Sequence, residues 1–231
     1  VDGTYGGEEL NEQVWKWQRR DKQVFIRVPS YRNIAAKETE MFEAVKNSNL
    51  DAVLSSFEIK AINKDSSSVV IDVTDLYSKD VQSLGLPQSL RTLYKITTMD
   101  DTRTYVDTIK SFPINIEVRS LKTYRATDPP GDKSIGSMTV EINNSMLLLP
   151  EVPYKVRLSD DRVGFFGQSQ TDYGLDAQKA QVTRYIHRWK LEPKDPEAYK
   201  RGELVEPKKQ IVYYIDPATP AKWRPYLIAG V

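Results

Sequence analysis

The sequence contains no cysteine, which excludes disulfide bonds, thiolate metal ligands and cysteine nucleophiles. Its only histidine is His187, so neither an HExxH motif nor a zinc site built from two or three histidines is present. No GxSxG motif accompanies His187, and we interpret it as a structural strand residue rather than part of a Ser-His-acid triad. The glycines form neither a GxGxxG pattern nor a P-loop, which argues against a nucleotide cofactor.

The chain also lacks an excess of charge and a long apolar run. Thirty-three basic residues balance thirty-two acidic ones, for a formal net charge of +1. This balance gives no indication of a nucleic-acid or anionic-membrane partner. No apolar run approaches the ~18 residues that a membrane-spanning helix needs, and no basic start precedes an apolar signal segment. The compartment therefore stays open at this level.

Alternation of apolar and polar residues dominates the chain and predicts a β-rich fold. Val14–Gln18 and Gln23–Val28 predict a hairpin, and Ala52–Ile62 with Val69–Val73 predicts a second strand pair. The period changes to helical spacing only between Asn33 and Asn49. Further strands are predicted at Leu90–Thr98, Ile114–Tyr124, Met138–Leu149, Val163–Phe166 and Val182–Trp189, with a short helix at Asp195–Arg201. Thr104–Ile109 suits either a strand or a helix, and a strand is favoured. We expect a mainly β (α+β) fold: an antiparallel sandwich or barrel-like domain of about nine to eleven strands with one or two short helices.

The C-terminal stretch predicts the beginning of a second domain. Gln210–Ile215 has the apolar, β-branched and aromatic composition of a buried strand, which Pro217 ends. Thr219 followed by Pro220 indicates the start of a helix. We therefore predict a β-rich accessory domain over residues 1–206 and the first strand and helix of another domain over residues 207–231.

Two groups of carboxylates are candidates for chemistry. Asp72, Asp75 and Asp80 offer the oxygen ligands that Ca²⁺ prefers, but their spacing is not that of an EF-hand loop. The favoured interpretation is a turn capped by Thr74 and Asp75 after the strand. The second group is the pair Asp160 and Asp161 with nearby Glu151, which would suit acid–base hydrolysis if burial raised one pKa. Arg162 beside this pair favours a structural ion pair instead.

Strand aromatics suggest a groove for sugars or peptide, although core packing is the more common role of such residues and the sequence does not separate the two. These aromatics are Trp15, Trp17, Tyr154, Tyr173, Tyr185 and Trp189.

Several long segments of mixed composition resemble one known family. The strongest are SDDRVGFF and RYIHRWKLEPKDPEAYKRGELVEPKKQIVYYIDPATPAKWRPYLIAGV; weaker ones are NSNLDAVLSSFEI, VVIDVTDLY, TRTYVDTIKSFPINIEV and SMLLLPEVPYKVR. Together they cover roughly Gln13 to Val231. The chain resembles the region of unknown function that precedes the peptidase domain in large bacterial zinc-dependent metalloproteases of metzincin type.

The resemblance implies a periplasmic, outer-membrane-anchored or secreted parent protein. Its zinc would be held by HExxH and a third histidine in a downstream domain, so no catalytic, cofactor or metal residue is expected in this chain. The expected partners are that peptidase domain and peptide substrate. The residues expected to contact them are Trp189, Tyr213, Tyr214, Trp223, Asp161 and Arg162.

The resemblance thus implies a non-catalytic N-terminal domain that packs on the peptidase domain and shapes its substrate cleft. Two alternatives remain open. One is a freestanding β-sandwich that binds glycan or peptide through surface aromatics. The other is a carboxylate-dependent hydrolase using Asp160, Asp161 or Glu151.

Overall fold

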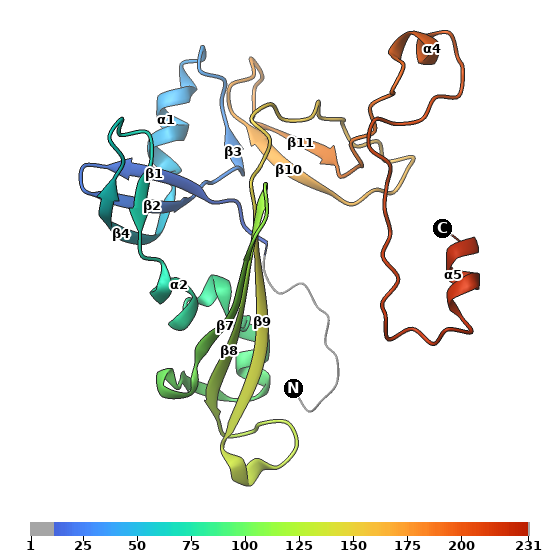
Figure 1. Ribbon diagram of the computed structural model, residues 1–231. Helices are drawn as coiled ribbons and strands as arrows, with labels where there is room; N and C mark the ends of the chain where they lie inside the picture. Colours follow the sequence, from blue (N-terminus) through green and yellow to red (C-terminus); the bar gives the residue numbers. More distant parts are fainter. Residues whose placement is uncertain (1–11, 231) are drawn as a thin grey trace. The chain divides into compact units, whose positions relative to one another are not determined.

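A computed structural model describes residues 12–230 of the chain, which form two compact units (Figure 1). Unit 1 comprises the residues up to 151 together with 171–181. Unit 2 comprises 152–170 and the residues from 182 onward. The described residues contain eleven strands in mostly antiparallel pairing, which confirms the predicted mainly β fold. They also contain five short α-helices, more than the one or two predicted.

The first sheet of unit 1 contains four antiparallel strands in the order β1-β2-β4-β5. Its strands are β1 (Lys16–Arg20), β2 (Gln23–Val28), β4 (Ala52–Ile62) and β5 (Val69–Ile71). Asp21 takes a positive φ of 52° in the turn of the predicted β1–β2 hairpin, a conformation that Asp tolerates better than most residues. Alternation places Val24, Ile26 and Phe57 on the buried face of this sheet.

The second sheet of unit 1 is built around β8 (Asn115–Ala126). β6 (Ile96–Met99) and β7 (Tyr105–Ser111) pair with successive parts of one edge of β8. β9 (Ser137–Leu147) pairs with the other edge in an unbroken antiparallel register from Asn115–Leu147 to Arg125–Ser137. The strands predicted at Ile114–Tyr124 and Met138–Leu149 are therefore confirmed as β8 and β9.

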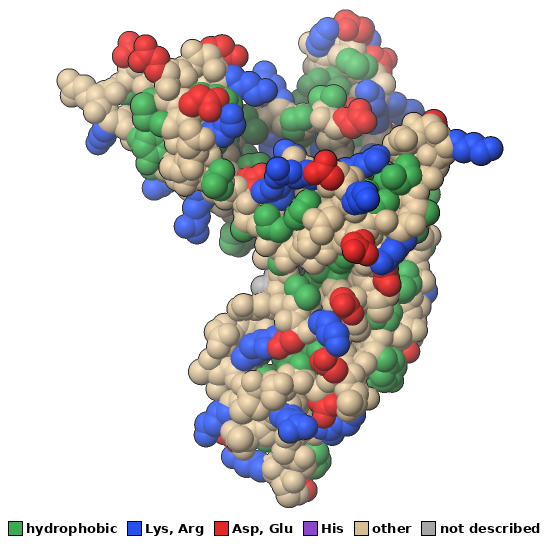
Figure 2. Space-filling model, turned by 90° about the vertical axis from the view of Figure 1, so that its left-hand side faces the viewer, with side chains coloured by type: hydrophobic (Ala, Val, Ile, Leu, Met, Phe, Trp, Pro, Cys, Tyr) green, Lys and Arg blue, Asp and Glu red, His purple; other side chains and the backbone are tan. Residues whose placement is uncertain are grey.

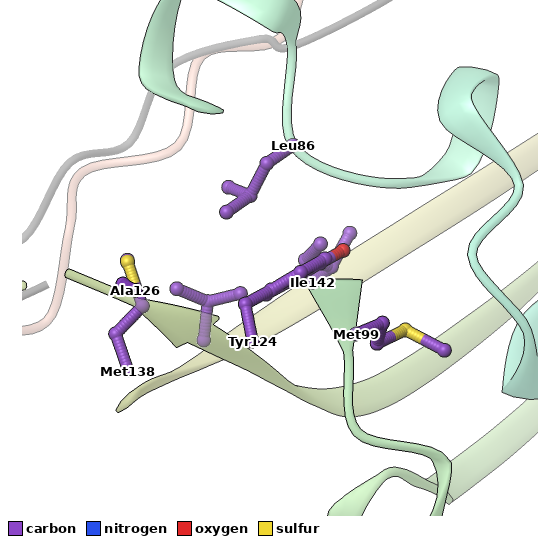
Figure 3. Packing of buried hydrophobic residues seen from close by; sticks show 7 residues of the cluster. Leu86, Met99, Tyr124, Ala126, Met138 and Ile142 are labelled. Atoms are coloured by element: carbon purple, nitrogen blue, oxygen red, sulfur yellow. The ribbon is translucent and has the colours of Figure 1, made fainter. Parts of the chain in front are cut away.

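Short helices cover the inner face of these sheets in unit 1. They are α2 (Thr74–Ser78), the 3₁₀ turn η1 (Gln82–Leu84) and α3 (Gln88–Leu93). One apolar cluster lies against α3 (Figure 3); it contains Leu86, Met99, Tyr124, Ala126, Met138, Val140 and Ile142. The other includes residues of α2 and η1 and contains Ile26, Phe57, Leu76, Tyr77, Leu84 and Val118. The packed interior of unit 1 therefore consists of two apolar clusters.

The remaining elements are few and short. β3 (Asn33–Ile34) pairs in parallel with the end of β10 (Gly167–Asp172), and α1 (Met41–Ser48) follows β3. β11 (Gln181–Ile186) lies beside β10. The last two helices are α4 (Pro196–Lys200), predicted from sequence, and α5 (Arg224–Ala229). Within residues 12–230, no helix has the length and apolar composition needed to cross a membrane.

Three predictions in the first part of the chain and in the β10 region are wrong. The predicted strand Leu90–Thr98 is α3 followed by β6, because Leu90 and Tyr94 lie four residues apart and pack on the same core. The predicted helix between Asn33 and Asn49 is helical only from Met41, since Asn33 and Ile34 pair with β10. The predicted strand Val163–Phe166 is irregular, and the strand begins at Gly167 instead.

The C-terminal prediction also differs from the structure. Gln210–Ile215 forms no strand with any described residue. A strand requires a neighbour for its ladder hydrogen bonds, and composition alone does not supply one. The final helix begins at Arg224 rather than at Thr219, because residues 217–223 form turns. The predicted domain boundary at 206/207 stays a prediction.

Candidate functional site

The four aromatic residues predicted to make contacts are all exposed in unit 2. Trp189 and Tyr213 are each 61% exposed, Tyr214 is 92% exposed and Trp223 is 52% exposed. Trp223 contacts the ring of Tyr226 at a centroid distance of 6.0 Å. No ring contact joins Trp189, Tyr213 and Tyr214 to one another among the described residues. The structure therefore presents these side chains outward without assembling them into one site.

The acidic pair of unit 2 forms ion pairs, as its neighbouring arginine predicts. Arg162 donates from Nε and Nη2 to the two carboxylate oxygens of Asp160, at 2.9 and 2.6 Å. This hydrogen bonding lowers the pKa of Asp160 and raises that of Arg162. Asp161 lies 3.8 Å from the guanidinium of Arg184. The carboxylate of Asp160, which Arg162 holds ionised, is suited to an ion pair rather than to the role of a general acid.

His187 and its neighbours hold the chain of unit 2 together. His187 is exposed, and its backbone N–H donates to the carbonyl oxygen of Phe166 at 2.8 Å. The guanidinium of Arg188 lies 4.1 Å from the ring centroid of Tyr154 and donates to its hydroxyl at 2.8 Å. A second guanidinium nitrogen donates to the carbonyl of Lys155, also at 2.8 Å. These contacts are structural, and they include one of the aromatics considered for a groove.

The acidic residues near α2 form a capped turn and an ion pair rather than a cation site. Asp72 accepts from the backbone N–H and the hydroxyl of Thr74 at 2.9 and 2.6 Å, and these bonds lower its pKa. Asp80 instead pairs with Arg91. Over residues 12–230, no group of three metal-ligating side chains is brought together. A turn is therefore present as predicted, but the side chain that accepts its hydrogen bonds is Asp72 rather than Thr74 or Asp75.

Unit 1 contains a buried polar centre that the sequence analysis did not identify. The alternation of β8 places Ser120, Lys122 and Tyr124 on its inner face, and all three are fully buried. The ammonium of Lys122 donates to the carbonyl oxygens of Leu84 and Lys79, at 3.0 and 3.3 Å. The sequence signal that could have identified this centre is a lysine on the apolar face of an alternating strand.

An arginine–aspartate pair lies next to the buried lysine. Arg91 donates from Nη1 to Asp80 at 2.8 Å and from Nε to the carbonyl of Leu86 at 2.8 Å, and its guanidinium lies 5.3 Å from the ring centroid of Tyr124. The hydrogen bond from Arg91 lowers the pKa of Asp80 despite its partial burial. The close packing depends on Gly85, because a Cβ there would lie 3.0 Å from the Tyr124 hydroxyl.

Burial controls the protonation of this centre. It lowers the pKa of Lys122 to about 8; Asp80 opposes the shift and Arg91 adds to it. Burial also raises the pKa of Tyr124, again with a contribution from Asp80. The hydroxyls of Ser83 and Ser120 are buried without a hydrogen-bond partner in the described residues. Lys122 is fully enclosed, so its amine is not exposed on the surface of unit 1.

Sequence comparison shows the family of this chain. Residues 7–194 match the family described as "Domain of unknown function (DUF5117)". The chain belongs to the DUF5117 family. No curated protein and no solved structure matches the chain. The DUF5117 match includes the buried centre of unit 1 and stops before α4, so the C-terminal aromatics Tyr213, Tyr214 and Trp223 lie outside it.

Proposed function

We propose that this chain is a non-catalytic accessory domain of a larger, secreted or periplasmic zinc metalloprotease. Unit 2 packs on the downstream peptidase domain, which carries the zinc, and helps to shape the cleft for peptide substrate. The resemblance of the C-terminal segments to metzincin-type proteases supports the choice of parent protein and its location. The inference that unit 2 is an interface rests on its own side chains.

The observation that carries the proposal is the absence of a core among the described residues of unit 2, where only Ala198 is buried. On the surface of a monomeric protein, exposed apolar residues are normally single and scattered. In unit 2 many apolar side chains are exposed, and Phe166 is 91% exposed. Figure 2, which views the molecule from the left-hand side of Figure 1, shows hydrophobic side chains scattered between charged ones. The exposed apolar residues of unit 2 include Val156, Leu158, Val163, Phe165, Phe166, Val182, Trp189, Leu204, Val212, Tyr213, Tyr214, Trp223, Tyr226 and Ile228.

These side chains need a partner if unit 2 is to be stably ordered. Full burial of one large apolar side chain contributes roughly 1.5–3 kcal/mol, so a few of them suffice to anchor an interface. Gln210–Ile215 also has unpaired strand composition, and a neighbouring sheet supplies the ladder partner that the described residues lack. Both features favour a protein surface over a soluble glycan as the occupant.

The test compares substitutions in the longer protein that contains the following domain. Phe166→Ser and Tyr214→Ser remove two nearly fully exposed apolar side chains, and Ile62→Ser, an exposed residue of unit 1, is the matched control. We expect both unit 2 variants to lower the Tm and reduce peptide cleavage, while the control changes neither. Equal behaviour of all three variants would contradict the proposal. Tight binding of oligosaccharide by the chain alone would support a freestanding glycan-binding module instead.

A further inference from the structure

The outer edge of β9 is the one long strand edge of unit 1 that its sequence does not protect. On the side away from β8, no strand within residues 12–230 pairs with β9 (Figure 1). The strand spans eleven residues, SMTVEINNSML, without proline, without a bulge and with Glu141 as its single charge. Natural sheets usually protect such edges, because a free row of N–H and C=O groups pairs with other strands.

The other edges of unit 1 show this protection. β1 carries three basic residues in five, and β5 has only three residues. β6 has four residues, and β7 carries a register shift after Val106 together with the charges of Asp107 and Lys110. The contrast with β9 indicates that its edge is kept free for pairing rather than left exposed by chance.

The direction of the free hydrogen-bonding groups follows from the register. The backbone N–H of Leu148 donates to Ile114, and that of Ala126 donates to Gly136, so even-numbered residues of β9 face β8. The odd-numbered residues therefore direct their N–H and C=O groups outward. Their side chains lie on the polar outer face, where the Asn143 amide donates to Glu117 at 2.8 Å.

We propose that β9 pairs antiparallel with β9 of a second copy of this chain, with the two-fold axis at Ile142. This register uses the full length of both strands. It sets Glu141 opposite Asn143 of the partner subunit, and Thr139 opposite Ser145 of the partner subunit, each pair occurring twice. Every outward backbone group then finds a partner, and no like charges face each other.

Side-chain chemistry favours a second copy as the occupant. Each Asn143 amide has a second N–H beyond the one given to Glu117, and Glu141 accepts it across the two-fold axis. The single charge of each edge thereby meets a donor from the partner. In the register centred on Glu141, the two carboxylates would face each other and repel, so the charge pattern selects the register centred on Ile142.

The test uses sedimentation equilibrium of the whole chain and a charge exchange at the two facing positions. Asn143→Lys sets a lysine opposite Glu141 of the partner subunit and beside its own Glu117, so the dimer is retained or strengthened. The double variant Glu141→Lys/Asn143→Lys sets lysine opposite lysine twice. We expect the double variant to dimerise at least about tenfold more weakly than Asn143→Lys alone, because two attractive side-chain pairs become repulsive.

Far-UV circular dichroism and the Tm show whether each variant keeps the fold. Glu141→Lys alone controls for the loss of the Glu141–Arg119 pair, which lies at 3.3 Å, and should retain a dimer. A wild-type chain that stays monomeric at the highest concentration reached overturns the proposal. A dimer that the double variant leaves unchanged also overturns it. The proposal is also overturned if the chain stays monomeric and β9 pairs with an added extended peptide, because the partner of β9 is then not a second copy of this chain.

Discussion

Lys122 should make the stability of unit 1 rise with pH in the mildly alkaline range. Its pKa is lowered from 10.5 to about 8 by burial. Between these values the unfolded chain holds a proton that the folded chain has lost, so the free energy of unfolding increases as pH rises through this window. The full shift of about 2.5 units corresponds to about 3 kcal/mol at 1.36 kcal/mol per unit. Between pH 8 and 9.5, titration of this one group contributes about 1.5 kcal/mol.

The perturbation is Lys122→Met, which keeps most of the side-chain volume and removes the titrating amine. At neutral pH the substitution avoids the cost of a buried charge but leaves the carbonyls of Lys79 and Leu84 unpaired, and these effects offset each other. The clear effect of Lys122→Met is therefore that the free energy of unfolding no longer rises with pH in this window. Tyr77 and Tyr124, whose pKa values burial raises above 10, lower the stability only at higher pH, which limits the measurement to pH 9.5.

The assay is urea unfolding followed by circular dichroism at several values between pH 7.5 and 9.5. The free energy of unfolding of the wild type should rise by about 1.5 kcal/mol more than that of Lys122→Met over the upper part of this range. Lys110→Met, at an exposed position of β7, is the matched control and should keep the wild-type slope. Equal slopes for the wild type and Lys122→Met would refute the argument that the amine is desolvated.

Three further substitutions test particular contacts. Arg91→Met leaves the partly buried Asp80 without its guanidinium partner and should lower the free energy of unfolding by about 1–3 kcal/mol at pH 7. Below pH 3.8 the difference between variant and wild type should shrink, because protonation of Asp80 removes the paired charge. Unfolding measured at both pH values tests this. Asp195→Ala removes the side chain that accepts two backbone N–H groups at the start of α4, which should lower local stability by about 1 kcal/mol, measured by hydrogen exchange of its amides. Gly167→Ala forces a Cβ against a backbone carbonyl of β11 and should speed exchange in β10 and β11, whereas Gly164→Ala, where nothing lies within 4 Å, should not.

The sequence predicted those elements whose side-chain pattern indicates the same structure as the pairing with their neighbours along the chain. β8 and β9 alternate over most of their length, and a loop that contains proline and glycine joins them as antiparallel neighbours, so pattern and pairing coincide. The β1–β2 hairpin follows for the same reason. The short helix predicted at Asp195–Arg201 is α4, which the Asp195 side chain caps, and Gly202 follows it with a positive φ of 86°.

The failures occur where tertiary contacts decide between local alternatives. Leu90–Thr98 has strand-like composition, but Leu90 and Tyr94 pack as successive turns of a helix over the core of unit 1. Gln210–Ile215 has strand composition without a pairing partner in residues 12–230. The polar centre at Lys122 was missed because three segments assemble it, and two of them supply only backbone carbonyls to the amine.

The central claim is that unit 2 forms an interface with the domain that follows it. Hydrogen–deuterium exchange of residues 152–170 and 211–230, in this chain alone and in the longer protein, tests the claim most directly. We expect fast exchange in the chain alone, because the described residues of unit 2 bury only Ala198, and strong protection in the longer protein. The amides of β8 serve as an internal reference and should exchange equally in both. Equal, fast exchange of unit 2 in the two proteins would contradict the account.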